Sequence, residues 1–577
     1  MAQPIYAGFY TYMVVWPQTN DARDAYHVYA VKLAAEMSKE TNPRATFLLP
    51  RDTAAGDVNP NYTVMFFYKG QAGYAWVVDD ETTLEATLDK AVQGRDVVRV
   101  VRWKVSKHVG ADPKEIIRYY LEKHGKFVET QKFTFYNIET YQLDQAGAGL
   151  TDGPLAPAAA DLGGQIALTG YALGDASGAG PAAATSVPAG DQLWVRLRFR
   201  LARPSAEGLK ASVTVADGAG HVVGQIDKLL VNNILHQPST QWAPGAEVDA
   251  YYLVPIAPAT APGDYQVGVA VYGAAGLTRL PVLSGKPGWA VAVRPDLTPP
   301  AADALGLGQA LNRPVTDGLT LLGLSAGLGE MVRPGERASL ALVWRADAPP
   351  SGDYRAALWA TRGKDAHPLS EPLPLAGLDY PSSRWAAGEV VRGWFDGRMP
   401  PDVESGDYSL AVRVTDAAEK PVAEIPLGKL RVQGWKRRFE APPMQTAVNA
   451  NFGGQIELLG YDLHADANPP SVVLYWRGTA AMDVSYTAFV HLLDPAGKVI
   501  GQVDHVPGDG AFPTTGWLPG EVIADEYHLA VPVPSGGAGG QLRLEAGLYD
   551  AQTGQRLAVV NQQGEPVADH VILAGGK

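Results

Sequence analysis

The chain has 577 residues, including 63 glycines and 44 prolines, so it is too long for a single core and rich in tight turns, as multidomain β proteins are. A net charge of −13 without a basic tract argues against nucleic acid as a partner. The absence of cysteine excludes disulfides, zinc–thiolate sites and a cysteine nucleophile.

The first residues predict neither a signal peptide nor a membrane span. MAQPIYAGFYTYMVVWPQ, residues 1–18, lacks a basic segment and contains only a short apolar patch. Elsewhere no apolar run approaches the roughly 18 residues that a spanning helix needs. If the protein works outside the cytoplasm, we therefore expect its targeting signal or membrane anchor to precede this sequence.

Residues 1–144 alternate between helical and strand-like periodicity. Helices are predicted over Ala22–Lys39 and Glu81–Gln93, and strands over Ala45–Pro50, Tyr62–Tyr68, Tyr74–Asp79, Asp96–Lys104 and Phe127–Leu143. Such alternation predicts a small α/β domain with an at least partly parallel sheet. Because no GxGxxG or GxxxxGK(S/T) loop follows any predicted strand, a nucleotide cofactor is not expected.

Two acidic segments of this domain mark helix starts. Asp112–Glu115 supplies an N-cap aspartate, a proline for the first helical position and a glutamate for the third, which predicts a helix from Pro113. Asp79 and Asp80 resemble the acidic pair that holds a metal–nucleotide sugar. A carboxylate between a strand and a helix is more often an N-cap, and we favour that role.

A linker and a repeated unit follow the α/β domain. Residues 145–161 are rich in alanine, glycine and proline, which indicates a linker. Beyond it, GGQIALTGYAL at 163–173 and GGQIELLGYDL at 453–463 are near-copies, and DGLTLLGLSAG at 317–327 is a diverged third copy. The alternating strands and turns that follow each copy predict three antiparallel β-sandwich modules, immunoglobulin-like or jelly-roll-like, over 162–290, 305–436 and 450–575.

One tryptophan recurs at an equivalent position in all three modules. Trp242, Trp385 and Trp517 each stand just before a glycine-containing turn. Exposed tryptophans there would stack on a sugar ring, which makes these three the candidate carbohydrate-binding residues. The alternative is that each ring plugs the end of its own sandwich, and the usual burial of tryptophan favours this alternative.

The sequence predicts no catalytic residue, no cofactor and no metal site. Three aspartates and three histidines share the last module: Asp494, Asp504, Asp509, His491, His505 and His528. The aspartates lack the D-x-D-x-D spacing of a calcium loop, so solvated turns are favoured. The histidines lack HxH or HExxH spacing, which disfavours zinc. No GxSxG motif is present, and no pair of carboxylates is singled out for sugar hydrolysis.

Two long segments resemble a known family. RVVRWKVSKHVGADPKEIIRYYLEKHGKFVETQKFTFYNIETYQL, residues 99–143, resembles the soluble domain that follows the last membrane helix of bacterial multi-spanning glycosyltransferases, relatives of the dolichyl-phosphate-mannose-protein mannosyltransferases. Residues 458–532, with LLGYDL, LYWRGTAAMDVSYTAFVHLLDPAGKVIGQVDHVP and WLPGEVIADEYHLAVP, are similar to the β-sandwich at the C-terminus of such proteins. The middle module shows the resemblance poorly.

This resemblance implies what the chain does and what it lacks. Members of that family transfer sugar from a polyprenyl-phosphate carrier, using acidic residues on loops between their first membrane helices. Because this chain has no such helices or loops, no catalytic residue carries over. The resemblance implies an extracytoplasmic, non-catalytic portion of a membrane glycosyltransferase, which binds or positions a glycan or an acceptor protein and reaches the membrane through segments outside this sequence.

Two other functions are weighed against this one. The chain would alternatively be a free-standing cell-surface or secreted protein whose sandwiches bind carbohydrate or act as spacers in adhesion. A glycoside hydrolase or lyase with accessory sandwiches is disfavoured, because residues 1–144 are too few for a (β/α)₈ barrel of about 250 residues.

Overall fold

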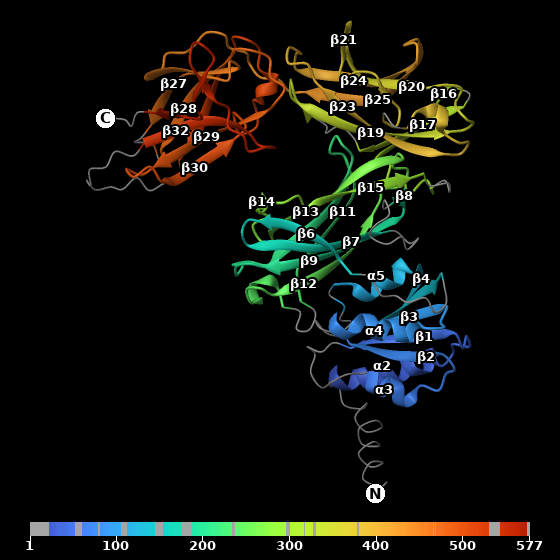
Figure 1. Cartoon of the computed structure of the whole chain (residues 1–577). Helices are drawn as coiled ribbons and strands as arrows, with labels where there is room; N and C mark the ends of the chain where they lie inside the picture. Colours follow the sequence, from blue (N-terminus) through green and yellow to red (C-terminus); the bar gives the residue numbers. More distant parts are fainter. Residues whose placement is uncertain are drawn as a thin grey trace. The chain divides into compact units, whose positions relative to one another are not determined.

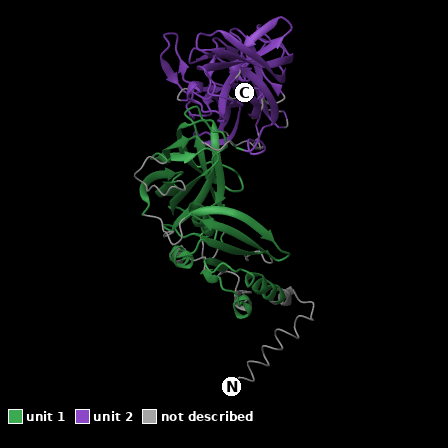
Figure 2. Cartoon of the chain, turned by 90° about the vertical axis from the view of Figure 1, so that its right-hand side faces the viewer, with its two compact units in different colours: residues 1–300 green, residues 301–577 purple. Residues whose placement is uncertain are grey.

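The structure is a computed structural model in which the chain forms two compact units, residues 1–300 and 301–577 (Figure 2). Unit 1 contains an α/β head and sandwich 1, and unit 2 contains sandwiches 2 and 3 (Figure 1). The residues that the structure describes are 22–51, 61–78, 81–104, 112, 114–144, 154–174, 186–232, 237–295, 300–316, 318–326, 331–377, 380–464, 467, 469–529 and 543–573.

The head, residues 22–144, is built on a mixed sheet. Its strands are β1 (Ala45–Arg51), β2 (Gly73–Val78), β3 (Val97–Trp103), β4 (Gly125–Lys132) and β5 (Tyr136–Leu143). The strand order is β2-β1-β3-β5-β4, in which β1 runs parallel to β2 and β3, whereas β5 runs antiparallel to β3 and β4. The predicted small, partly parallel α/β domain is confirmed.

Helices cover both faces of this sheet (Figure 1). They are α2 (Ala22–Met37), α3 (Asn61–Phe67), α4 (Glu81–Val92) and α5 (Ile116–Lys123). Alternation along β1 places Leu48 in the core beneath α4 and α5, and Phe47 and Leu49 in the core beneath α2 and α3. Because both faces are buried, the central strands are almost continuously apolar.

The strand predicted over Tyr62–Tyr68 is wrong, because helix α3 occupies this segment. Val64, Phe67 and Tyr68 pack into the head core at spacings of three and four residues, which is the helical period. Strands β1 and β2 pair directly with each other, so no strand lies between them. A short apolar run is compatible with the period of a helix and with that of a strand. Here the direct pairing of β1 with β2 leaves only the helix.

Each sandwich consists of two packed sheets. Sandwich 1 contains β6 (Ala156–Leu162), β7 (Ile166–Gly174), β8 (Ser186–Pro188), β9 (Gln192–Leu201), β10 (Leu209–Ala216), β11 (Val222–Leu229), β12 (Glu247–Pro255), β13 (Gly263–Gly273), β14 (Val282–Ser284) and β15 (Gly288–Arg294). Sandwich 2 contains β16 (Gln309–Thr316), β17 (Leu319–Ala326), β18 (Met331–Val332), β19 (Arg337–Ala346), β20 (Tyr354–Arg362), β21 (Asp365–Pro368), β22 (Leu373–Pro374), β23 (Val390–Arg398), β24 (Gly406–Asp416) and β25 (Pro421–Val432). Sandwich 3 contains β26 (Thr446–Phe452), β27 (Ile456–His464), β28 (Ser471–Gly478), β29 (Tyr486–Leu493), β30 (Val499–His505), β31 (Val522–His528), β32 (Arg543–Asp550), β33 (Val559–Val560), β34 (Pro566–Ala568) and β35 (Val571–Leu573).

All three sandwiches share one strand order. One sheet contains β12-β9-β7-β6 in sandwich 1, β23-β19-β17-β16 in sandwich 2 and β31-β28-β27-β26 in sandwich 3. The other contains β11-β10-β13-β15, β21-β20-β24-β25 and β30-β29-β32-β35, respectively. Neighbours in these orders pair antiparallel, while β8 and β18 add short parallel pairs in sandwiches 1 and 2. The predicted fold class is confirmed, and the repeat in sequence is also a repeat in topology.

Two modules begin earlier than the sequence predicts. Strand β6 lies within 145–161, the predicted linker, and its Ala160 and Leu162 enter the core of sandwich 1. Strand β26 begins at Thr446, before the predicted boundary at 450. Each of these strands pairs with the strand that carries the glycine-rich repeat, so a hairpin opens the module. The alanine-rich sequence of β6 hides the alternation that usually reveals a strand.

The head and sandwich 1 share an aromatic core. Helix α5 contacts β12, and the ring centre of Tyr119 lies 5.1 Å from that of Tyr251 and 6.1 Å from that of Trp194. The ammonium of Lys123 lies 3.7 Å from the ring centre of Trp194, within the range of a cation–π contact. The two sandwich residues, Trp194 and Tyr251, belong to the same hydrophobic cluster as the head helices α4 and α5. The head is therefore packed directly on sandwich 1.

A second joint lies within unit 2, between sandwiches 2 and 3. Arg437 bonds the carboxylate of Glu521 at 2.5 Å and the Gly516 carbonyl oxygen at 2.8 Å, and it also reaches the carbonyl oxygen of Pro401 in sandwich 2. The indole N–H of Trp435 donates to the same Glu521 at 2.8 Å. Because Glu521 is fully buried, both donors are needed to offset the cost of removing its charge from water.

The repeated sequence changes at Gly516 to accommodate this joint. Gly516 occupies the position of Gln241 in sandwich 1 and Arg384 in sandwich 2, immediately before the recurring tryptophan. A β-carbon at Gly516 would overlap the carbonyl oxygen of Pro334 in sandwich 2. Only glycine therefore allows the two backbones to approach this closely.

Replacing Gly516 by alanine is expected to loosen the joint between sandwiches 2 and 3, because the added carbon has no space against the backbone of Pro334. Hydrogen exchange of the full chain should become faster at backbone amides near residues 335 and 515–521. The control is Arg384→Gly, which makes the equivalent position glycine in sandwich 2 and should leave the joint unchanged. Equal exchange in the two variants would contradict this role of Gly516.

Candidate binding site in the head

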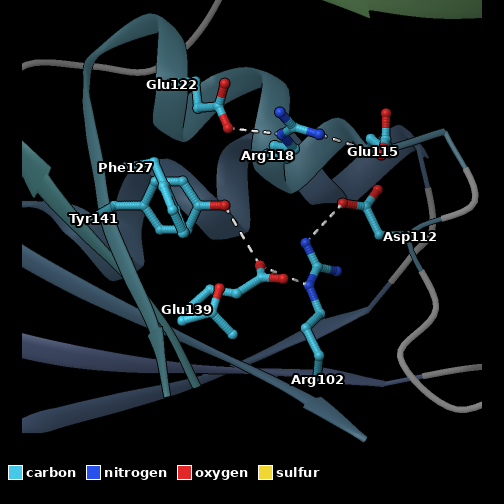
Figure 3. A pocket seen from close by; sticks show the side chains of 9 residues that line it. Arg102, Asp112, Glu115, Arg118, Glu122, Phe127, Glu139 and Tyr141 are labelled. Atoms are coloured by element: carbon cyan, nitrogen blue, oxygen red, sulfur yellow. Dashed lines mark hydrogen bonds and ion pairs between the residues drawn. The ribbon is translucent and has the colours of Figure 1, made fainter. Parts of the chain in front are cut away.

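A pocket of about 400 Å³ lies in the head between helix α5 and the β4–β5 hairpin (Figure 3). Charged side chains dominate its wall, together with one threonine and two aromatic rings: Arg102, Asp112, Glu115, Arg118, Glu122, Phe127, Thr130, Glu139 and Tyr141. They come from β3, from the turn before α5, from α5 itself and from the hairpin. This volume falls in the range of pockets that hold small molecules.

Arg102 brings a charge into the middle of the head sheet. Its side chain is mostly buried, so the charge requires partners. The guanidinium Nε donates to Glu139 on the neighbouring strand β5 at 3.1 Å, and Nη2 lies 3.6 Å from a carboxylate oxygen of Asp112. Removing one member of such a group would leave an uncompensated buried charge, so the three side chains hold one another in place.

Helix α5 begins later than the sequence predicts. Asp112 is the predicted cap, and its two carboxylate oxygens accept the N–H groups of Ile116 and Ile117 at 2.5 and 2.9 Å. Glu115, however, has left-handed backbone angles, φ 56° and ψ 37°, so the helix starts at Ile116 rather than at Pro113. Pro113 itself lies outside the described residues.

Arg118 forms a second charged group on the pocket wall. Its Nε donates to Glu122 one turn later at 2.6 Å, and its Nη1 lies 3.7 Å from Glu115. Glu115 in turn binds the ammonium of Lys228 in sandwich 1. Burial opposes the charged form of Glu115, but Lys228 and Arg118 outweigh it and hold the pKa of this carboxyl below its ordinary value. Sandwich 1 therefore supports one side of the pocket.

The apolar part of the pocket is an exposed phenylalanine. Phe127 on β4 is 48% exposed, and its ring meets that of Tyr141 edge-on, with 5.5 Å between the ring centres. Tyr141 is buried and donates to Glu139 at 3.4 Å, and burial raises the pKa of its phenol. A register shift in β4 falls between Phe127 and Glu129. The pocket thus offers an aromatic face beside carboxylate and guanidinium groups.

The turn before α5 also reaches sandwich 1 through Lys114. Its ammonium donates to the backbone carbonyl of Asp249 at 2.6 Å and is 5% exposed as a residue. The carboxylate of Asp249 is held by Arg196 and Arg198, each at 2.7 Å, and Arg196 also lies 2.9 Å from Glu85 on α4. Burial, together with the nearby charge of Arg196, lowers the pKa of Lys114 to about 7.

The stability of unit 1 should therefore rise with pH between about 7 and 10. In this range Lys114 is protonated in the unfolded chain and largely neutral in the folded unit, so unfolding takes up a proton and becomes harder as pH increases. The free energy of unfolding should increase by at most about 1.4 kcal/mol per pH unit. Urea denaturation at several pH values should show this slope in the unchanged chain and in Lys126→Met, an exposed control. The same slope in Lys114→Met would contradict the assignment.

The recurring tryptophans are buried at equivalent positions in the three sandwiches. Trp242, Trp385 and Trp517 are 5%, 1% and 1% exposed, and each follows a short 3₁₀ turn. Each indole N–H donates to the backbone carbonyl five residues earlier, at 2.9, 3.4 and 3.0 Å. This packing agrees with the plug interpretation. Sugar stacking by these three rings stays a prediction, and their burial does not favour it.

Replacing Trp385 by alanine should destabilise sandwich 2 by about 3–5 kcal/mol, because it removes the contacts of a large buried ring and leaves a cavity. Denaturation of the full chain would measure the loss. Trp359→Ala in the same sandwich is the matched control, since Trp359 is only partly buried and should cost less. A sugar-binding role for Trp385 instead predicts lost binding with little change in stability.

Those of the other candidate residues that the structure describes are not gathered into one metal site. Asp79 and Asp80 lie outside the described residues. Asp494 accepts two backbone N–H groups of its own turn, and Asp504 lies 3.7 Å from His491. Within the part of the chain that the structure describes, no group of histidine, aspartate and glutamate side chains is arranged to hold a metal ion.

Sequence reasoning named Asp112 and Glu115 only as residues of a helix start and did not predict the pocket, although one signal was present. Arg102 interrupts the apolar strand DVVRVVRWK, and a charge on a buried strand requires a partner. The identity of that partner, Glu139, follows only from the pairing of β3 with β5. The remaining wall residues are surface-type charges whose convergence depends on how α5 lies over the hairpin.

Comparisons with known proteins show no family for the chain. No family model matches it, and no curated protein matches it. A similar solved structure is the C-terminal domain of Wzt, which shares 11% sequence identity and covers 25% of this chain and 84% of that domain, with a TM-score of 0.19. A score this low supports no argument about function. Among the described residues, no helix is both long and apolar enough to cross a membrane.

Proposed function

We propose that the chain is a non-catalytic, extracytoplasmic portion of a membrane glycosyltransferase, and that its head binds and positions a sugar unit in the pocket beside Phe127. The observation that carries the proposal is the exposed Phe127 ring next to the paired carboxylates and guanidinium groups of Arg102 and Arg118. The family resemblance of residues 99–143, which include every residue of the pocket wall, adds the glycosyltransferase context.

The chemistry of a sugar fits these groups. The C–H face of a sugar ring is apolar and stacks on an aromatic ring, while its hydroxyl groups both donate and accept hydrogen bonds. Carboxylates such as Glu139 accept from hydroxyl groups, and guanidinium groups such as that of Arg118 donate to them. A pocket of about 400 Å³ has room for one or two sugar rings.

The firm packing of the head on sandwich 1 supports a positioning role. Glu115 on the pocket wall is bonded to Lys228, and Lys114 is bonded to the backbone of Asp249. A ligand held in the head would therefore have a fixed position relative to sandwich 1. A protein that positions a substrate for another domain requires such a fixed arrangement. The same pocket would serve a free-standing carbohydrate-binding protein. Apolar spans of about 20 residues encoded upstream in the same reading frame would support the membrane version.

The experiment is a titration of the full chain with neutral mono- and disaccharides, followed by ligand-observed NMR. Phe127→Ala should weaken binding about two- to tenfold, because an aromatic contact contributes roughly 0.5–1.5 kcal/mol. Phe439→Ala is the control, since Phe439 is equally exposed but lies in unit 2. If no saccharide binds at millimolar concentration, or if both variants bind like the unchanged chain, the proposal fails.

A further inference from the structure

We infer that the head pocket selects uncharged or positively charged sugar units and rejects phosphorylated and carboxylated ones. This inference rests on the proposed function and adds the class of ligand. Its consequence is that the pocket takes the glycan or acceptor sugar, rather than the phosphate group of a polyprenyl-phosphate carrier. Three features of the pocket lead to it.

The first feature is the charge of the wall. Carboxylates outnumber arginines on the wall, even though Lys228 of sandwich 1 offsets the charge of one of them, Glu115. The charged lining residues are Arg102, Arg118, Asp112, Glu115, Glu122 and Glu139. Because the pocket is partly shielded from water, charges in it interact more strongly than they would in bulk solvent. A phosphate or carboxylate that enters would be repelled, whereas an ammonium group would be attracted.

The second feature is that both guanidinium groups already have carboxylate partners. Arg102 lies between Glu139 and Asp112, at 3.1 and 3.6 Å. Arg118 lies between Glu122 and Glu115, at 2.6 and 3.7 Å. Because these carboxylates already offset the charge of each guanidinium, a ligand anion would gain less from either arginine than from an unpaired one. A hydroxyl group does not have this disadvantage, because it can donate to the carboxylates where they are.

The third feature concerns the beginning of α5. A helix N-terminus is a common binding point for phosphate, because its first N–H groups point outward. Here the N–H groups of Ile116 and Ile117 are both taken by the carboxylate of Asp112. Asp112 thus occupies the position that a phosphate would need.

The test is isothermal titration calorimetry of the full chain at low salt. Four matched ligands are compared: glucose, glucosamine, glucose 6-phosphate and glucuronate. Glucose and glucosamine should bind, and the two anionic sugars should bind at least tenfold more weakly. Glu122→Gln should narrow the difference between glucose and glucose 6-phosphate about tenfold, because it removes a negative charge and releases Arg118. Glu139→Gln, which releases Arg102, is the second variant if the first does not fold.

The matched control is Glu129→Gln. Glu129 is exposed on β4 and does not line the pocket, so this variant makes the same change in net charge without freeing an arginine. Its discrimination should equal that of the unchanged chain. If Glu129→Gln reduces the difference in affinity between glucose and glucose 6-phosphate as much as Glu122→Gln does, discrimination is an effect of overall charge and the inference is wrong. Tighter binding of glucose 6-phosphate than of glucose also overturns it, while leaving the proposed function standing. If none of the four ligands, nor any other saccharide, binds, both proposals fail.

Discussion

The carboxylate of Asp112 accepts the first two N–H groups of α5 and lies within an ion-pair distance of Arg102, all in a largely buried position. It thereby joins the helix to the central strand β3. It also fixes the turn from which Lys114 and Glu115 extend to sandwich 1. The pocket and the joint between head and sandwich are thus two sides of one turn, and both depend on the contacts of one buried carboxyl group.

In unit 2, another buried carboxylate connects two neighbouring domains. Glu521 is fully buried, and it holds Trp435 and Arg437 of the segment that connects sandwiches 2 and 3. The equivalent Glu389 in sandwich 2 keeps the local part of this role, since its carboxylate accepts the N–H of Ala386 in the same turn. The glutamate at this position thus stabilises a turn in sandwich 2, whereas in sandwich 3 it also stabilises the joint between the two sandwiches.

In the pocket, charged side chains lie beside the exposed ring of Phe127. These charges are paired with one another rather than left for a ligand, which favours ligands that can share hydrogen bonds over those that bring a competing charge. The nearby sandwich limits how far the wall can move, because Glu115 has one partner in the pocket wall and one in sandwich 1. The same ion pairs therefore hold the pocket wall in place and determine which ligands it accepts.

The sequence by itself determined the class of every module. Alternating apolar residues and repeated turns specified the three sandwiches, and the change to helical spacing specified the head, because these periods follow from backbone geometry alone. It also identified Asp112 as a helix cap. The tertiary structure alone decided that Tyr62–Tyr68 is helical and that Arg102 meets Glu139. Those outcomes depend on contacts between residues distant in the chain, and such contacts leave no local pattern to read.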